Sequence, residues 1–130
     1  MNSRTILNKI KKYNISAKKF FGQNFLFDEN ILRKIVEKSN IKEKVNILEI
    51  GPGPGGLTQE ILKSNVNEVF VIEKDKDLLP LLEDIKITFP NKLNIISEDA
   101  LNFDIRRLNH NPFKIISNLP YNISTILLIK

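Results

Sequence analysis

The sequence predicts an α/β fold built on a mostly parallel sheet, and three features of the chain carry that prediction. Short apolar runs alternate with segments whose apolar residues recur at helical spacing, which is typical of parallel sheets with right-handed crossovers. A glycine-rich loop, residues 51–56, follows the first apolar run directly. The later runs end in acidic or amide residues. Because open α/β sheets bind ligands beyond the carboxyl ends of their strands, we expect these strand ends to share one crevice.

The first part of the chain predicts two helices, a strand and a third helix. Ser3 can cap a short amino-terminal helix. Asp28 is a good N-cap for a helix over residues 29–39, where aliphatic residues recur at helical spacing. Residues 45–50 predict the first strand. Residues 57–63, after the glycines, predict a helix whose first N–H groups face the loop.

The rest of the chain predicts three more strands, at residues 68–73, 93–97 and 113–118. A helix between the second and third strands begins at Asp75 or Asp77. Asp77 is the better cap, because Pro80 then falls in the first turn, where no N–H is needed. Residues 102–108 predict one irregular turn, and we expect residues 124–130 to open a helix.

Three glycines in the loop, Gly51, Gly53 and Gly56, have the G-x-G-x-x-G spacing that accompanies dinucleotide binding. Glycine lets the backbone turn sharply and lets a ligand approach without a Cβ in the way. The following helix would direct its dipole and free N–H groups towards an anionic part of that ligand. The spacing alone is a weak signal, and a plain glycine-rich turn is the alternative.

Two acidic residues at strand ends strengthen the ligand-binding interpretation. Glu73 closes the second strand about 20 residues after the glycines, where a carboxylate can accept hydrogen bonds from a ribose diol. Asp99 follows the third strand. Each could instead cap a helix or lie on the surface, but a strand end beside a crevice favours binding.

The fourth strand ends in Asn118-Leu119-Pro120-Tyr121, which suits the binding of a flat, nitrogen-bearing base. The Tyr121 ring can stack on a base, a contact worth about 1–3 kcal/mol. The Asn118 side-chain oxygen can accept a hydrogen bond from an exocyclic amine. Pro120 biases Leu119 towards extended geometry, so the Leu119 carbonyl would point in a set direction beside that amide. An ordinary turn is the alternative for this stretch taken alone.

Composition narrows the class of protein. A chain of 130 residues forms one core rather than two independent domains. It has no cysteine, and its single histidine, His110, lies among asparagines, so we expect no metal site. No apolar run approaches the roughly 20 residues of a membrane span, and the amino terminus lacks the apolar segment of a secretory signal. We therefore expect a cytoplasmic protein.

Positive charge gathers in the amino-terminal third of the chain. Residues 1–44 hold 11 Lys and Arg against 4 Asp and Glu, or +7, and residues 45–130 hold 9 against 11, or −2, which together give +5. Lys18 and Lys19 adjoin two phenylalanines and are predicted to contact RNA phosphates. For residues 9–12 a solubilising arm is an equal alternative.

Taken in order, these motifs closely resemble the ribosomal RNA adenine dimethyltransferases, from about Ala17 to the end of the chain. The motifs are Gln23-Asn24-Phe25-Leu26, Glu49-Ile50-Gly51-Pro52-Gly53, Val71-Ile72-Glu73, Glu98-Asp99-Ala100 and Asn118-Leu119-Pro120-Tyr121. The resemblance implies a Rossmann-like class I S-adenosylmethionine-dependent methyltransferase. Its implied reaction is the dimethylation of adenine N6 in small-subunit (16S) ribosomal RNA, during ribosome biogenesis. Pro54-Gly55-Gly56 departs from the pattern where relatives vary.

The resemblance implies S-adenosylmethionine as the cofactor and assigns residues to it. The loop at Gly51 would hold the methionine part, Glu73 the ribose hydroxyls, and Asp99 the adenine amine. Asn24 and Leu26 would close over the cofactor from the amino-terminal side.

The resemblance also implies that Asn118, Leu119, Pro120 and Tyr121 are the catalytic residues, with Asn118 counted among the cofactor-binding residues as well. Tyr121 would stack on the unstacked target adenine. Acceptance of the N6 protons by Asn118 and the Leu119 carbonyl would favour a pyramidal nitrogen that attacks the sulfonium methyl. Positioning and stabilisation of that geometry would carry the catalysis without a strong base.

The family carries a further, mostly helical domain that these 130 residues lack. We expect a basic extension over residues 1–16 and a partial cofactor-binding domain over residues 17–130, whose sheet is incomplete. The expected partner is small-subunit ribosomal RNA or the pre-ribosomal small subunit, bound by a monomer. These residues alone are expected to transfer little or no methyl, because loss of alignment is costly.

Three other functions fit part of the sequence. A nicotinamide-dependent oxidoreductase would use the same glycines and Glu73, but it leaves residues 118–121 unexplained. A large-subunit ribosomal RNA adenine methyltransferase of the antibiotic-resistance type shares nearly every motif. A non-catalytic RNA-binding or transcription-assisting protein needs only the basic surface.

Overall fold

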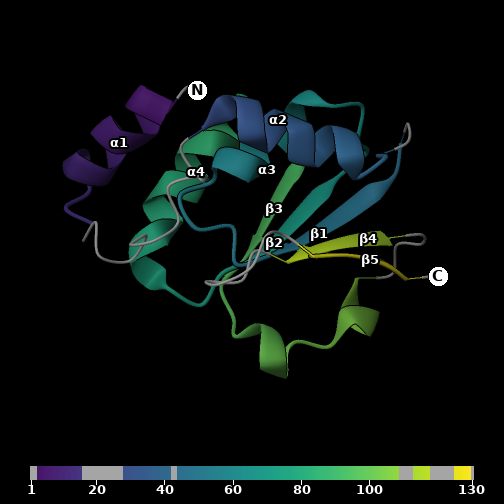
Figure 1. Ribbon diagram of the computed structural model, residues 1–130. Coiled ribbons are helices and arrows are strands. Elements are labelled where there is room, and N and C mark those ends of the chain that lie inside the picture. Colours follow the sequence, from purple (N-terminus) through teal and green to yellow (C-terminus); the bar gives the residue numbers. More distant parts are fainter. Residues whose placement is uncertain (1–2, 16–27, 42–43, 109–112, 118–124, 130) are drawn as a thin grey trace.

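A five-stranded sheet with the strand order β3-β2-β1-β4-β5 forms the centre of the molecule (Figure 1). The computed structural model describes residues 3–15, 28–41, 44–108, 113–117 and 125–129. Four strands run parallel to one another: β1 (Asn46–Ile50), β2 (Val69–Ile72), β3 (Leu93–Ile96) and β4 (Phe113–Ser117). The fifth, β5 (Thr125–Ile129), runs antiparallel to β4.

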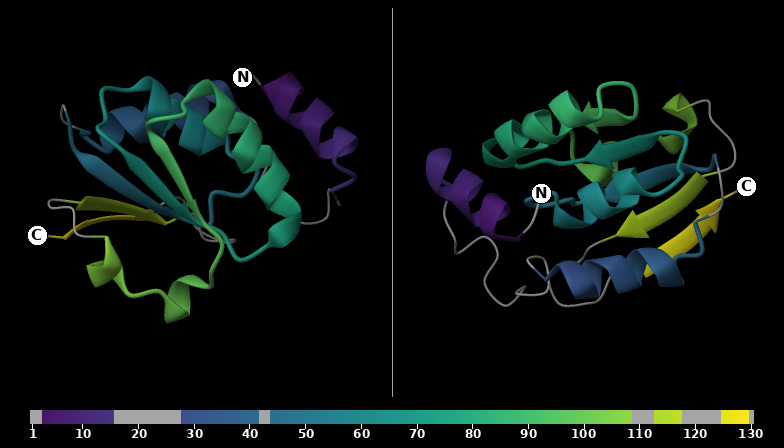
Figure 2. Two further views of the ribbon diagram at one scale, coloured as in Figure 1. Left: turned by 180° about the vertical axis from the view of Figure 1, so that it is seen from behind. Right: turned by 90° about the horizontal axis from the view of Figure 1, so that it is seen from above.

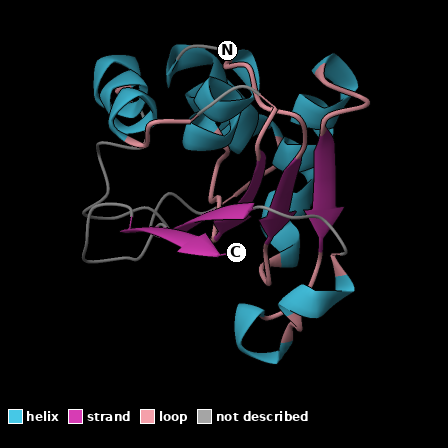
Figure 3. Ribbon diagram, turned by 90° about the vertical axis from the view of Figure 1, so that its right-hand side faces the viewer, coloured by secondary structure: helices cyan, strands magenta, loops and turns pink. Residues whose placement is uncertain are grey.

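Three helices cover one face of this sheet, and short 3-10 turns cover the other (Figures 1 and 2). The helices are α2 (Glu29–Lys38), α3 (Gly56–Lys63) and α4 (Leu79–Thr88). The turns on the opposite face are η4 (Ala100–Asn102) and η5 (Ile105–Arg107). Figure 3 shows the sheet between these unequal layers.

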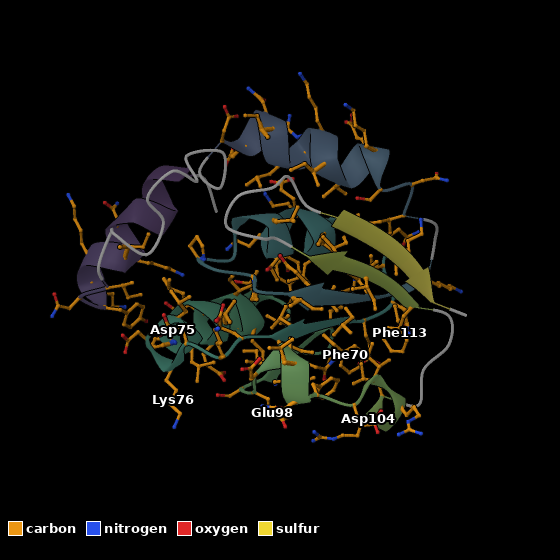
Figure 4. The ribbon with its side chains drawn as sticks, turned by 60° about the horizontal axis from the view of Figure 1, so that its bottom comes forward. Phe70, Asp75, Lys76, Glu98, Asp104 and Phe113 are labelled. Carbon is orange, nitrogen blue, oxygen red and sulfur yellow. The ribbon has the colours of Figure 1, made fainter. Side chains whose placement is uncertain are left out.

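The central strands β1 and β2 are buried on both faces, so apolar residues follow one another along them with few polar interruptions. Ile47 and Val71 point into the core beneath the helices, with Leu57 of α3. Leu48 and Phe70, their neighbours in sequence, belong to the core on the other face. There the rings of Phe70 and Phe113 meet edge to face, with centroids 5.8 Å apart (Figure 4). A parallel sheet covered on both faces requires such continuous apolar strands.

The amino-terminal helix α1 (Ser3–Lys12) packs beside α4. Ile10 and Ile15 are buried. The Tyr13 hydroxyl donates a hydrogen bond to Asp84 at 2.7 Å, and the Lys9 ammonium lies 3.4 Å from the same carboxylate. The Tyr13 hydrogen bond, with a smaller contribution from the Lys9 charge, holds the Asp84 pKa below its usual range. The predicted division of the chain at residues 16 and 17 stays a prediction.

The predicted positions of the first four strands are confirmed, and Asp28 caps α2 by accepting hydrogen bonds from the N–H groups of Asn30 and Ile31. Of the two starts predicted for the helical segment after β2, Asp75 is the cap that forms, and the preference for Asp77 is wrong. Asp75 caps a short turn, η3 (Lys76–Leu78), and α4 begins only at Leu79. The Asp75 carboxylate accepts a hydrogen bond from the Asp77 N–H, so capping occurs two residues earlier than Asp77 would give.

The helix expected over residues 124–130 is also wrong, because residues 125–129 form β5. Apolar runs of this length suit a buried strand as well as a helix, and periodicity cannot separate the two. Three of the five residues are β-branched, which favours a strand. Pairing with β5 also satisfies the outer backbone groups of β4, from Phe113 opposite Ile129 to Ser117 opposite Thr125.

The irregular turn expected over residues 102–108 is a pair of 3-10 turns, η4 and η5. In the described part of the chain no helix is long and apolar enough to cross a membrane. The same residues contain no group of three His, Cys, Asp or Glu side chains that could hold a metal ion.

Candidate functional site

The glycine loop turns from β1 into α3 through three residues in the left-handed region. Gly51, Gly53 and Gly55 have φ angles of 67°, 57° and 89°. These values are uncommon for residues with a Cβ. The N–H of Gly51 donates to the carbonyl of Ile72 at 3.0 Å, which fixes the loop against the end of β2. The spacing that the sequence pattern emphasised includes Gly56, but the third left-handed residue is Gly55, and Gly56 begins α3.

Gly55 is required for packing against α4. A Cβ at this position would lie 2.3 Å from Cδ1 of Ile85 and 3.6 Å from Cδ2 of Leu82. The sequence analysis attributed the glycines to turning and to ligand approach. At Gly55 the group that approaches closely is a side chain of the protein itself.

Glu73 is fastened between the glycine loop and the turn that follows β2. Its side-chain Oε1 accepts a hydrogen bond from the Gly53 N–H at 3.3 Å, and its Oε2 accepts one from the Asp75 N–H at 3.0 Å. The residue is only 6% exposed. Burial raises the Glu73 pKa, and the two backbone N–H groups partly oppose that rise. Figure 4 labels Asp75 and Lys76, at the turn after Glu73.

Glu49 lies at the end of β1, beneath α3, and the sequence analysis gave it no role. Its side chain is fully buried, and the Thr58 hydroxyl of α3 donates a hydrogen bond to its Oε1. Its Oε2 has no hydrogen-bond partner among the described residues. Burial, with a smaller contribution from the charge of Glu73, raises the Glu49 pKa to about 7. One signal was available in the sequence: Glu49 is an acid inside the apolar run of β1, where a buried charge needs a reason.

Asp99 follows β3 and caps η4. Its Oδ1 accepts a hydrogen bond from the Leu101 N–H at 3.0 Å. Asp99 therefore does cap a turn, as the alternative to cofactor binding expected. Capping uses only one acceptor site, and a carboxylate has about four, so the side chain could still accept a hydrogen bond from a ligand. Its role in binding the cofactor stays a prediction.

The remaining site residues of the sequence analysis lie outside the described residues. They are Lys18, Lys19, Asn24, Leu26, Asn118, Leu119, Pro120 and Tyr121. The strand that precedes residues 118–121 is β4, which ends at Ser117, and Ser117 pairs with Ile50 at the end of β1. The end of β4 and the start of the glycine loop therefore lie at the same edge of the sheet.

The described site thus combines a glycine loop in the left-handed conformation with two buried carboxyl groups, Glu73 bonded to the loop and Glu49 beneath α3. A model of the ribosomal RNA adenine dimethylases matches residues 14–130. The chain belongs to this family. A ribosomal RNA small subunit methyltransferase A from Sinorhizobium fredii is 44% identical over 120 residues, which cover 92% of the chain and 40% of the relative. One from Rhodopseudomonas palustris is 46% identical over 121 residues, covering 92% and 42%. The chain spans about two fifths of the length of these relatives.

Solved structures show that this member of the adenine dimethylase family has the class I methyltransferase fold. The 23S ribosomal RNA methyltransferase ErmE superposes with a TM-score of 0.54 at 20% identity, over 72% of the chain and 48% of ErmE. A dimethyladenosine transferase from Plasmodium falciparum gives 0.54 at 20% identity, over 68% and 41%. At such identities the likeness concerns the fold, and the predicted α/β architecture is confirmed.

Proposed function

We propose that the chain binds S-adenosylmethionine and forms the cofactor-binding part of an enzyme that dimethylates adenine N6 in small-subunit ribosomal RNA. The observation that carries this proposal is the position of Glu73. Backbone N–H groups of Gly53 and Asp75 hold its carboxyl at the glycine loop, where it could accept hydrogen bonds from the two ribose hydroxyls of the cofactor. Membership of the adenine dimethylase family supports the reaction.

The remaining roles follow from the same arrangement. Gly51 and its loop would hold the methionine part of the cofactor, and Asp99 would accept a hydrogen bond from its adenine amine. Asn24 and Leu26 would cover the cofactor. Glu73 and Asp99 would not act as bases, because each would only accept hydrogen bonds, Glu73 from the ribose hydroxyls and Asp99 from the adenine amine.

Methyl transfer would depend on Asn118, Leu119, Pro120 and Tyr121. Tyr121 would stack on the flipped adenine, while the Asn118 amide oxygen and the Leu119 carbonyl would accept its N6 protons. The lone pair of N6, otherwise delocalised into the ring, would then be available for in-line attack on the sulfonium methyl. Lys18 and Lys19 would contact RNA phosphates.

Small-subunit ribosomal RNA is the proposed substrate in preference to the large-subunit alternative. The curated relatives at 43–46% identity carry the small-subunit name. ErmE, which carries the large-subunit name, resembles the chain at only 20% identity. The protein would act as a monomer in the cytoplasm, and its partner would be this RNA or the pre-ribosomal small subunit.

Calorimetric titration of the 130-residue chain with S-adenosylmethionine, its demethylated product and NAD tests the cofactor. Binding of the first two without NAD is the expected result. Glu73→Ala should weaken binding by about 1.5–3 kcal/mol, because a charge-assisted acceptor is lost. Glu83→Ala, at an exposed position on α4, is the matched control and should leave affinity unchanged. Stronger binding of NAD would overturn the assignment.

The reaction is tested on a chimera in which the remainder of the Rhodopseudomonas palustris relative follows the chain. Labelled methyl should pass from S-adenosylmethionine to unmethylated small ribosomal subunits and not to large ones. Asn118→Ala in the chimera should depress turnover far more than cofactor affinity, since its proposed partner is the target amine. Normal turnover in this variant would remove the amide from the mechanism.

A further inference from the structure

The Glu49 carboxyl has an environment that suits its neutral form. One oxygen receives the Thr58 hydroxyl hydrogen bond, and the other has no hydrogen-bond partner among the described residues. Water does not reach the side chain, which is completely buried. An ionised carboxylate that is buried and only half hydrogen-bonded is costly, so a proton on Glu49 removes most of that cost.

The elements around Glu49 supply no positive charge to it in the described part of the chain. Its register partners on the flanking strands are Val71 of β2 and Ile116 of β4, both apolar. The charge that acts on it comes from Glu73 and is negative.

Other charged groups of the neighbouring elements are engaged or exposed. The Lys114 ammonium of β4 donates to the carbonyls of Ser39 and Asn40, and Glu60 of α3 pairs with Lys63 at 3.2 Å. The cations of α2 are exposed to solvent: Arg33, Lys34 and Lys38.

Glu49 nevertheless lies close to where a ligand of the loop would bind. It precedes Gly51 by two residues and responds to the charge of Glu73, whose own carboxyl contacts Gly53. A cation on the loop would therefore act on Glu49 through a poorly screened interior, and it would favour the ionised carboxylate.

We propose that Glu49 is a neutral acid in the empty chain and loses its proton when a cationic ligand occupies the glycine loop. The inference rests on the proposed function, because S-adenosylmethionine supplies the cation. Its sulfonium, ammonium and carboxylate leave a net charge of +1, whereas the thioether product has no net charge. Glu49 would thus make the site select the sulfonium form over the product.

The proton balance of this step is simple. Cofactor binding converts the Glu49 carboxyl to a carboxylate, and the proton leaves to solvent. When the methyl group is transferred, the bond from sulfur to the methyl carbon breaks as the bond from N6 to that carbon forms, the sulfonium becomes a neutral thioether, and the displaced N6 proton leaves to solvent. Glu49 then regains a proton from solvent. The attraction between its carboxylate and the sulfonium is lost, which favours release of the thioether product.

Calorimetry at pH 6.5, in two buffers of different ionisation enthalpy, counts the protons released on binding. Because Glu49 has a pKa of about 7 before the ligand binds, S-adenosylmethionine should release about 0.8 proton, and the demethylated product close to none. Between pH 6 and pH 8, the preference for the sulfonium cofactor should rise about tenfold, because the ionised fraction of Glu49 rises by that factor.

Two variants assign the proton. Glu49→Gln should bind both ligands with no net release from the protein, and it also corrects for titration of the ligand's own amine. Thr58→Val removes the hydrogen bond that lowers the Glu49 pKa, so release should increase at pH 7. The second variant keeps the test decisive if the first destabilises the chain.

The outcomes separate this inference from the proposed function. Failure of the chain to bind either ligand overturns both. Normal binding of S-adenosylmethionine with no proton release overturns the inference alone. Release that persists undiminished in Glu49→Gln would show that the proton comes from another group and would also overturn the inference.

Discussion

The glycine loop between β1 and α3 and the crossover from β3 to β4 both begin where a parallel strand ends, but different interactions hold them. The loop leads into a helix whose residues Gly56 to Leu62 are all buried. Its contacts come from distant parts of the chain: Glu73, directly after β2, and Ile85 on α4. The crossover is more exposed: Leu101 is 92% accessible, although Leu108 is buried and Phe103 and Ile105 pack against the core beside it.

Local hydrogen bonds shape the crossover. Asp99 accepts from the Leu101 N–H, and Asp104 accepts from the Arg106 N–H, each across two residues. Glu98 and Asp104 mark this segment in Figure 4. The glycine loop should therefore be intolerant of substitution, because tertiary packing fixes it, whereas single changes at the exposed positions of the crossover should have small effects.

Gly55→Ala should produce the largest change in stability. The new Cβ would need a left-handed φ of 89° and would lie 2.3 Å from Ile85 Cδ1. Backbone strain and overpacking together should lower the free energy of unfolding by about 2–4 kcal/mol, measured by urea denaturation. Because the clashing atom ends a flexible side chain, Ile85→Val in the same chain should relieve part of the loss. A change below about 0.5 kcal/mol would show that the loop is not fixed by packing.

A second large effect should appear in the pH dependence of stability. Glu49 has a folded pKa raised from 4.5 to about 7, so the folded chain binds more protons than the unfolded chain between these values. This contribution is complete below pH 4.5 and is lost as the pH rises to about 7. The loss is on the order of 3 kcal/mol.

Urea denaturation at several pH values between 4.5 and 7 measures that slope. Glu49→Gln should flatten it, and Glu83→Gln, at an exposed position, should not. Stability that rises with pH across this interval in the unaltered chain would contradict a protonated Glu49.

Arg107→Ala should produce the smallest effect. Arg107 forms a two-pronged ion pair with Glu98 at 3.0 and 3.1 Å, but its side chain is 58% exposed. Exposed ion pairs contribute about 0–1 kcal/mol, so thermal denaturation should show a loss of no more than about 0.5 kcal/mol. Leu101→Ala, at the same segment, is the matched control. A loss above 1 kcal/mol would mean that Arg107, which also lies over the Phe103 ring, is more than an exposed ion-pair partner.

The sequence was most informative where one local rule decided the structure. Alternating apolar runs predicted the first four strands, and Asp28 predicted the start of α2, because a buried strand and an N-cap are read from a few neighbouring residues. The spacing of Gly51 and Glu73 also predicted that these residues would meet at one edge, since parallel strands align their carboxyl ends. How they bind a ligand remains proposed.

The features that the sequence did not predict depend on partners far along the chain. The role of Gly55 comes from Ile85, and that of Glu49 comes from its burial under Thr58. The strand over residues 125–129 depends on the open edge of β4. No pattern within a short window contains such information.

The strand order also dictates the sequence of events as the chain is synthesised and folds. The central strand β1 pairs on one side with β2, where Ile47 faces Val69, and on the other with β4, where it faces Lys114. These partners are 22 and 67 residues away (69 − 47 and 114 − 47). The nearer pairing closes the shorter loop, so it should form first. One edge of β1 would then stay open during translation until β4 emerges, an interval in which the nascent chain is exposed to mispairing. Pulsed hydrogen exchange during refolding should accordingly protect the amides of β2 before those of β4.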